Sequence, residues 1–127
     1  MKIKTTSQED YLKAIFVLEK QMGEEVHSVD VARYLGFSKP SVSQAVGNLS
    51  ERGLIYVDKN HILHLTKEGR LLAEKTYERH CFFTNQLLSI GVDMETAQED
   101  ACKLEHAISD VSFQKLKEKY SFVKCCL

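Results

Sequence analysis

Three side chains toward the C-terminal end of the sequence have the types and spacing of metal ligands. In the segment DACKLEH, Cys102, Glu105 and His106 stand at positions i, i+3 and i+4, so they project from one face of a helix. A thiolate, a carboxylate and an imidazole together suit a borderline transition-metal ion better than Ca²⁺ or Mg²⁺. The alternative is a core cysteine beside a surface Glu-His pair, which the triplet alone does not exclude.

Two more residues extend this candidate metal site. Asp10 stands at the start of the first expected helix, and His80 stands in the middle of a long one. Ligands from three separate helices would tie distant parts of the chain together, which is the mechanical arrangement that a sensor needs. Each residue also has an ordinary interpretation. Asp10 is then a helix-start carboxylate interacting with free N–H groups, and His80 is a partly buried histidine bonded to a backbone carbonyl.

A second group of polar residues lies on a helix expected to begin after Gly36. Gln44 can pair with an adenine edge, serines can bond bases or phosphates, and Lys39 can neutralise a phosphate. The Pro40 ring can touch a thymine methyl group. On an isolated helix, such residues are more often plain solvated surface. The candidate DNA-reading residues are Ser38, Lys39, Pro40, Ser41, Ser43 and Gln44.

The elements around this helix favour DNA binding over plain surface. Two helices joined by a short glycine-containing turn and followed by a β-hairpin make a winged helix-turn-helix. Apolar periodicity, caps and turn residues predict helices over 7–22, 28–35 and 39–52, and strands over 54–57 and 62–65 joined by a tight turn at 58–60.

The rest of the chain is expected to be helical, over 67–90, 94–108 and 111–119. No linker rich in proline or serine separates the two parts, so the long helix is expected to lead directly from one to the other. We therefore predict a mainly α protein, with a winged helix-turn-helix DNA-binding domain over 1–66 and a helical metal-sensing domain over 67–127.

Composition and charge set limits on the class of protein. Hydrophobic residues make up 43% and charged residues 28% of the chain, which argues against disorder. The N-terminal MKIKTTSQEDY lacks the apolar core of a signal peptide, and the apolar stretches are too short to span a membrane. We therefore expect a cytoplasmic protein with reduced thiols. A net charge of −1 is unusual for a nucleic-acid binder, so the protein must concentrate its positive charge on one surface or acquire positive charge by binding cations.

The other cysteines have no assigned role. Cys81, Cys125 and Cys126 are expected to be bystanders, with a redox or metal device at the adjacent Cys125 and Cys126 as the alternative.

Several of these segments, in order and at matching spacing, resemble the diphtheria toxin repressor family, which includes iron-dependent regulators and manganese transport regulators. The resemblance covers roughly residues 5–116 and implies an all-helical dimerisation and metal-binding domain after the winged helix-turn-helix. It also implies a homodimer in which metal promotes binding to a palindromic operator, usually repressing metal-uptake genes. The segments are SQEDYLKAIFVLEK, VARYLGFSKPSVSQAVGNLSERGLI, LTKEGRLLAE, ERH and DACKLEHAIS.

The resemblance assigns roles to individual residues. His80 falls on the histidine that serves one of the family's two metal sites. The positions that approach bases correspond to Ser38, Pro40, Ser41 and Gln44. The family's main metal ligands correspond to Asp10, Cys102, Glu105 and His106.

The chain departs from both branches of the family. Lys13 stands where the manganese branch has a carboxylate and Cys102 where it has glutamate, while the iron branch commonly has methionine where this chain has Asp10. Thr84 and Gln98 replace further second-site ligands of the iron branch, which puts a second ion per subunit in doubt. The SH3-like C-terminal domain of the iron branch is expected to be absent.

The ligand types also bear on the choice of metal. The soft sulfur of Cys102 argues against pure Mn²⁺ selectivity, whereas Asp10 favours harder ions. We expect Fe²⁺ first, Mn²⁺ second and Zn²⁺ third. The main alternative is a metal-independent winged-helix regulator in which the Cys-Glu-His cluster is packing and surface charge. A metalloenzyme is not expected, since no nucleophile–base motif or phosphate loop is present in the sequence. A scaffold that only dimerises would leave the reading helix unexplained.

Overall fold

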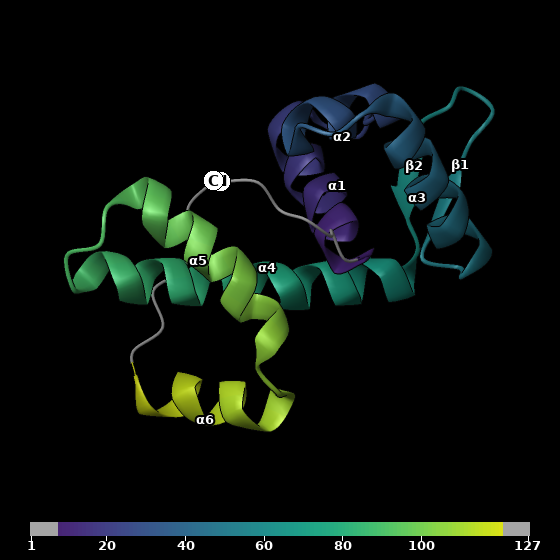
Figure 1. Cartoon of the computed structure of the whole chain (residues 1–127). Coiled ribbons are helices and arrows are strands. Elements are labelled where there is room, and N and C mark those ends of the chain that lie inside the picture. Colours follow the sequence, from purple (N-terminus) through teal and green to yellow (C-terminus); the bar gives the residue numbers. More distant parts are fainter. Residues whose placement is uncertain (1–7, 121–127) are drawn as a thin grey trace. The chain divides into compact units, whose positions relative to one another are not determined.

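A computed structural model describes residues 8–120, which form a mainly helical fold with one small sheet (Figure 1). This confirms the predicted fold class. The chain divides into two compact units, and the boundary lies inside the long helix, between Glu74 and Lys75. The elements are α1 (Gln8–Met22), α2 (Ser28–Leu35), α3 (Lys39–Glu51), β1 (Ile55–Val57), β2 (Leu63–Leu65), α4 (Lys67–Ser89), α5 (Met94–Ala107) and α6 (Asp110–Lys119).

The first unit is built around α1, which packs against α2, α3 and β2. Gly36 ends α2 in the left-handed conformation, with φ of 74°, and its N–H donates to the carbonyl of Ala32 over 2.8 Å. Ser38 then caps α3, because its Oγ accepts a hydrogen bond from the N–H of Ser41. The core side chains that are at most 1% exposed include Leu12, Ile15, Val31, Val42, Leu49 and Leu63.

The wing is an antiparallel pair in which Ile55 faces Leu65 and Val57 faces Leu63. Each strand begins one residue later than the sequence predicts, at Ile55 and Leu63. The predicted tight turn at 58–60 is too short, because the loop continues to 62 and includes His61 at φ of 65°. The extra residues are stabilised by a side chain, since Asp58 accepts hydrogen bonds from the N–H groups of Asn60 (2.8 Å) and Ile62 (3.0 Å).

The start of α4 lies very close to the backbone that precedes the wing. Thr66 caps the helix by accepting from the N–H of Gly69 at 3.1 Å, and its hydroxyl donates to the carbonyl of Gly53 at 2.7 Å. A Cβ atom on Gly69 would lie only 1.9 Å from the carbonyl oxygen of Leu54. Glycine is therefore required at this position by close approach of two backbones.

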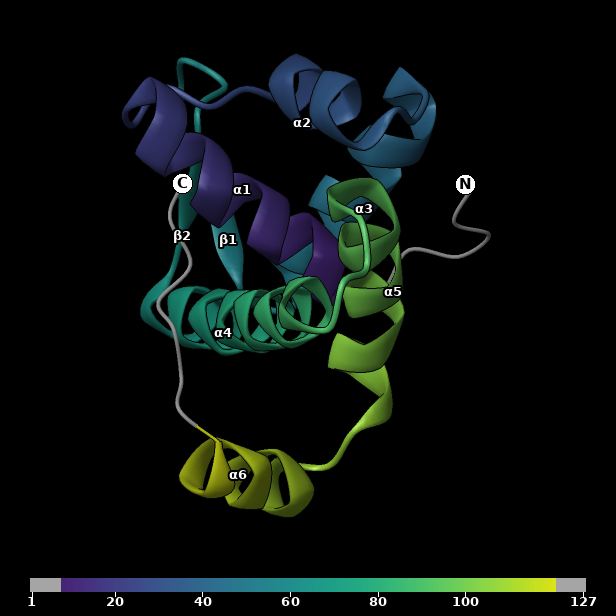
Figure 2. The same cartoon turned by 90° about the vertical axis from the view of Figure 1, so that its left-hand side faces the viewer.

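The second unit contains the C-terminal part of α4 together with α5 and α6, which are joined by a short connection (Figure 2). Asp93 caps α5 by accepting from the N–H of Thr96, and Ser109 caps α6 in the same way. Phe82 of α4 packs edge-on against Phe113 of α6, with ring centroids 5.4 Å apart. Helices α4 and α5 end one residue earlier than predicted, and α6 begins one residue earlier. No helix within residues 8–120 is long and apolar enough to cross a membrane.

Candidate metal centre

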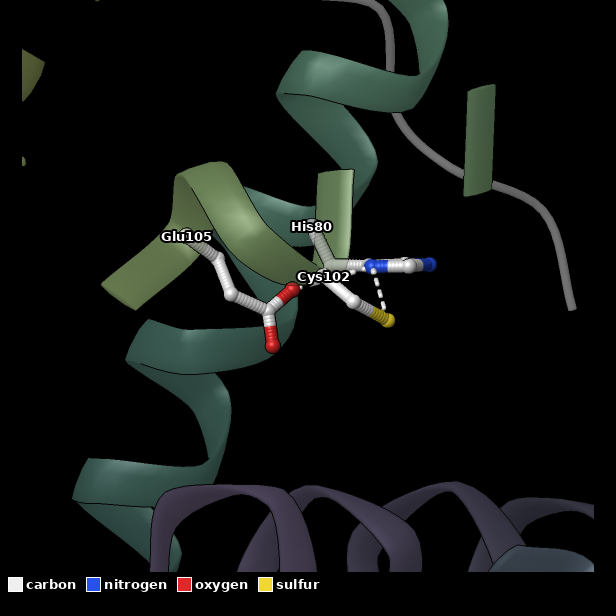
Figure 3. Close-up of side chains that lie close together, drawn as sticks. All are labelled: His80, Cys102 and Glu105. Carbon is white, nitrogen blue, oxygen red and sulfur yellow. Dashed lines mark hydrogen bonds and ion pairs between the residues drawn. The ribbon is translucent and has the colours of Figure 1, made fainter. Parts of the chain in front are cut away.

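Two helices of the second unit bring three potential metal ligands together. His80 lies on α4, and Cys102 and Glu105 lie on α5 (Figure 3). The Nδ1 atom of His80 is 2.9 Å from Oε1 of Glu105 and 3.8 Å from Sγ of Cys102. One ligand atom from each residue lies within 4.8 Å of the others. The structure thus brings His80 to the Cys102–Glu105 pair, and the role of these residues as metal ligands stays a prediction.

Glu105 is the most deeply buried member of this centre. Its side chain has 0% exposure, and both carboxylate oxygens face imidazoles: Oε1 faces His80, and Oε2 lies 3.2 Å from Nε2 of His106. The two imidazoles are 16% and 24% exposed, respectively. A buried carboxylate is unfavourable unless it is paired, and the two histidines supply that pairing. The backbone-carbonyl partner considered for His80 is replaced in the structure by this carboxylate.

The chemistry of the donor set fits a transition-metal ion. His80 offers a ring nitrogen, Cys102 a sulfur and Glu105 carboxylate oxygens, which is the mixture expected for a borderline ion and not for Ca²⁺ or Mg²⁺. The three ligand atoms lie close enough together to be offered to a single ion. His106 stands beside them through its contact with Glu105.

Asp10 belongs to the first unit, where it is 6% exposed at the start of α1. Its Oδ1 atom lies 3.9 Å from Nζ of Lys13, one helical turn further on, and both side chains are less than 10% exposed. Asp10 is therefore paired with a buried ammonium group. Its place among the metal ligands stays a prediction.

The predicted DNA-reading residues form one exposed surface. All six of them are exposed, while Val42 and Leu49 on the opposite face of α3 are buried. Ser38 has a structural task as well, because its hydroxyl donates to Oγ of Ser41 over 3.0 Å. The outward arrangement is as predicted; contact with DNA stays a prediction. The residues are Ser38, Lys39, Pro40, Ser41, Ser43 and Gln44.

A buried arginine beside the metal centre was not predicted from the sequence. Arg79 is buried and donates hydrogen bonds to the carbonyl of Ile108, at 2.7 Å, and to the carboxylate of Asp110. Its position next to His80 in the ERH segment was the one available signal. Cys81 is buried, and its expected role as a bystander stays a prediction, whereas Cys125 and Cys126 lie outside the described residues.

Comparison with known proteins covers both units. Residues 4–63 match the family described as iron dependent repressor, N-terminal DNA binding domain. Residues 66–127 match the family described as iron dependent repressor, metal binding and dimerisation domain. The chain belongs to the iron-dependent repressor family. The resemblance to the diphtheria toxin repressor family is thereby confirmed.

Relatives of this family member include a transcriptional regulator, a diphtheria toxin repressor and a manganese regulator of known structure. The transcriptional regulator MntR of Escherichia coli O157:H7 is 38% identical over 102 residues, which cover 80% of this chain and 65% of MntR. The diphtheria toxin repressor of Corynebacterium diphtheriae is 33% identical over 111 residues, covering 87% of this chain and 49% of the relative. The structure of the manganese regulator SloR has a TM-score of 0.85 at 32% identity, covering 96% of this chain and 57% of SloR.

The repressor-family chain therefore spans between about half and two thirds of the length of these relatives. The family consists of transcriptional repressors and not of enzymes, in agreement with the sequence-based expectation. Its matched domains are a DNA-binding domain and a metal-binding and dimerisation domain, and homologues of both iron-dependent and manganese-dependent type are present among its relatives.

Proposed function

We propose that this chain is a metal-dependent transcriptional repressor that binds a palindromic operator as a homodimer in the cytoplasm. The observation that carries this proposal is the convergence of His80, Cys102 and Glu105 in a chain that also has an exposed reading helix. The ligand cluster would sense an ion, and the exposed face of the helix would bind DNA. A repressor that responds to a metal needs both.

Residues of the first unit support the DNA-binding part of this proposal. Helix α3 is capped by Ser38 and has its polar face exposed, so its N-terminal end can enter a major groove. Gln44 is the side chain suited to a base edge, and Lys39 is suited to a phosphate. A homodimer would present two such helices related by a two-fold axis, and this symmetry is why we propose a palindromic operator.

The metal-binding part of the proposal rests on the ligand atoms that His80, Cys102 and Glu105 offer. A bound divalent ion would supply positive charge and fixed geometry at the centre. His80, Cys102 and Glu105 would hold it, with His106 beside Glu105 and Asp10 added from the first unit. Because Asp10 and the other ligands belong to different units, binding by both would fix the placement of the reading helix. Metal sensing would then be coupled to DNA affinity as a linkage free energy.

Cys102 decides our ranking of the metals. Thiolate sulfur favours Fe²⁺ or Zn²⁺ over Mn²⁺, whereas the carboxylates of Asp10 and Glu105 are compatible with all three ions. We propose Fe²⁺ as the physiological ion and Mn²⁺ as the second choice. The manganese regulator SloR and a manganese-dependent transcriptional repressor are among the related structures, which supports Mn²⁺ as the alternative ion. Control of metal-uptake genes follows from the same proposal.

The test is an anaerobic titration of demetallated protein with Fe²⁺, Mn²⁺ and Zn²⁺ separately. Binding to a DNA fragment from the protein's own promoter region is followed by fluorescence anisotropy at fixed salt. We expect one metal to tighten binding by about tenfold or more, which corresponds to about 1.4 kcal/mol of coupling. Binding that no metal changes would favour the metal-independent regulator, in which the Lys13 ammonium provides a permanent cation beside Asp10.

The contribution of Asp10 is tested by Asp10→Asn in the same titration. If Asp10 is a ligand, the variant loses metal affinity and metal-dependent DNA binding together. Equal metal affinity in the variant and the wild type would restrict the centre to the second unit.

A further inference from the structure

We propose that Arg79 is a positioning residue of the metal centre, which holds the C-terminal end of α5 so that Glu105 faces His80. This inference rests on the proposed metal-binding function. Arg79 is not itself a proposed ligand. Its role is to fix the main chain of Glu105, which is one.

The contacts of Arg79 converge on the end of α5. Its Nη1 atom donates to the carbonyl of Ile108 at 2.7 Å and approaches the carbonyl of Glu105 at 3.5 Å. Its Nη2 atom donates to the carboxylate of Asp110, and the guanidinium lies 5.1 Å from the ring centroid of Phe113. The side chain is only 8% exposed. Arg79 is therefore a buried group directed at the junction of α5 and α6.

The end of α5 needs such a partner. The last carbonyl groups of a helix have no N–H donor within the helix, and a following glycine in the left-handed conformation often allows the next N–H groups to supply one. Here the residue after α5 is Ile108, in an extended conformation with φ of −114° and ψ of 143°. A guanidinium provides several N–H donors in a fixed plane, and its positive charge is favourable at a helix C-terminus. Arg79 thus closes α5 two residues after His106.

Two consecutive residues of α4 hold the same residue of α5. Arg79 approaches the backbone carbonyl of Glu105, and His80 contacts its carboxylate. The main chain and the side-chain end of Glu105 are thereby fixed from one turn of α4. Loss of the Arg79 contacts would let the last turn of α5 shift, and the separation of the ligand atoms would shift with it. Outer partners that orient ligands in this way commonly alter metal affinity by about 10–100-fold when they are removed.

Helix α6 has other attachments to α4, so changing Arg79 does not release it. Lys75 pairs with Asp110 at 2.9 Å, and Lys117 pairs with Glu78 at 2.7 Å. The Lys75–Asp110 pair also offers a matched control. The variant Lys75→Met removes one partner of Asp110 but leaves the contacts to the carbonyl groups of Glu105 and Ile108 in place.

The experiment uses Co²⁺ as the probe with the full chain, anaerobically. Wild type, Arg79→Met, Arg79→Lys and Lys75→Met are titrated, with affinity and the ligand-field absorption spectrum recorded for each and helix content followed by circular dichroism. We expect both Arg79 variants to bind Co²⁺ about tenfold or more weakly, with an altered spectrum. Lysine restores the charge but not the planar set of donors. Lys75→Met is expected to match the wild type in both readouts.

Each other outcome has a definite meaning. A folded Arg79→Met protein with wild-type affinity and spectrum would overturn the positioning role. If that variant does not fold, Arg79→Lys decides, and a wild-type spectrum in the lysine variant overturns the proposal. An equal loss in Lys75→Met also overturns it, because the effect would then come from Asp110. Absence of Co²⁺ binding in the wild type would instead refute the proposed metal-binding function itself, and this inference with it.

Discussion

The Nδ1 atom of His80 and the Oε1 atom of Glu105 lie 2.9 Å apart, and this contact joins α4 to α5 at a carboxylate that has no exposed surface. A carboxylate in such a position is kept there by its partners, since burial alone is unfavourable for its charge. The geometry therefore makes Glu105 the residue whose charge matters most to the centre.

Replacing Glu105 by glutamine tests this directly. Glu105→Gln keeps the size and hydrogen-bonding capacity of the side chain but removes the negative charge that a cation needs. We expect metal affinity to fall by about tenfold or more, at least 1.4 kcal/mol, with helix content unchanged. Isothermal titration with Mn²⁺ and Co²⁺ measures the loss. Glu95→Gln, an exposed carboxylate in the first turn of the same helix, is the matched control. Wild-type affinity in Glu105→Gln would remove this residue from the centre.

His106 gives a second and separate prediction. Its Nε2 atom contacts Oε2 of Glu105, and its side chain is 24% exposed, whereas that of Glu105 is fully buried. We expect His106→Ala to abolish the metal-dependent gain in operator affinity while the protein stays folded and dimeric. Anisotropy with and without metal, together with light scattering, checks both parts. A normal metal response in this variant would show that the ligand assignment is wrong.

Local signals made much of this fold predictable. Gly36 and Ser38 mark a helix end and a helix start within the adjacent few residues, and the structure places both boundaries where those signals predict them. The wing loop was harder, because its length depends on Asp58 accepting from the N–H groups of residues two and four positions away. The hydrophobic periodicity of the sequence does not indicate these hydrogen bonds, so it does not predict the length of the loop.

In the candidate centre, too, some residues could be predicted from the sequence and others could not. Cys102 and Glu105 are predictable because one helical turn separates them, and His80 was a candidate through its place in the long helix, to which the family resemblance added. Arg79 could not be found in this way. Its partners, the carbonyl of Ile108 and the carboxylate of Asp110, lie about thirty residues away and depend on how α5 ends against α4. Tertiary contacts of this kind leave no short-range trace in the sequence.

Gln44 is predicted to read a base, and it can be separated from residues that only bind phosphate. Gln44→Ala should weaken binding to the operator by about 1–3 kcal/mol and leave binding to random DNA nearly unchanged. Lys39→Ala is the comparison, because loss of a phosphate contact should weaken both complexes alike and reduce the salt slope by about 1. Anisotropy titrations at several salt concentrations measure these effects. Equal losses on operator and random DNA for Gln44→Ala would refute base reading.

The wing contains a pH-dependent contribution to stability. Hydrogen bonding from His64, followed by the N–H of Ile62, holds the pKa of Asp58 below its usual value of 3.8. A carboxyl group with a lowered pKa in the folded state stabilises the fold when ionised. This contribution is fully present above that usual value, which the group has in the unfolded chain. It is lost as the pH falls through the lower folded-state value.

The variant Asp58→Asn should show this dependence by difference. We expect it to be less stable than the wild type at pH 6 to 7, and we expect the gap to close progressively below about pH 4. Urea unfolding of both proteins at a series of pH values, with chelator present, measures the gap. A difference that stays constant down to pH 3 would mean that the Asp58 charge does not stabilise the wing.

Two glycines inside helices should respond in opposite directions to alanine. At Gly69 a Cβ atom would lie 1.9 Å from the carbonyl oxygen of Leu54, so Gly69→Ala forces two backbones apart. We expect a net loss of about 1–3 kcal/mol, as for other overpacked sites. At Gly47 in α3 a Cβ atom meets no heavy atom of residues 8–120 within 4 Å. Gly47→Ala should therefore raise stability by about 0.5–1 kcal/mol through the better helix propensity of alanine. Urea unfolding of the metal-free proteins measures both changes, and a stabilised Gly69→Ala would contradict the close approach of α4 to Leu54.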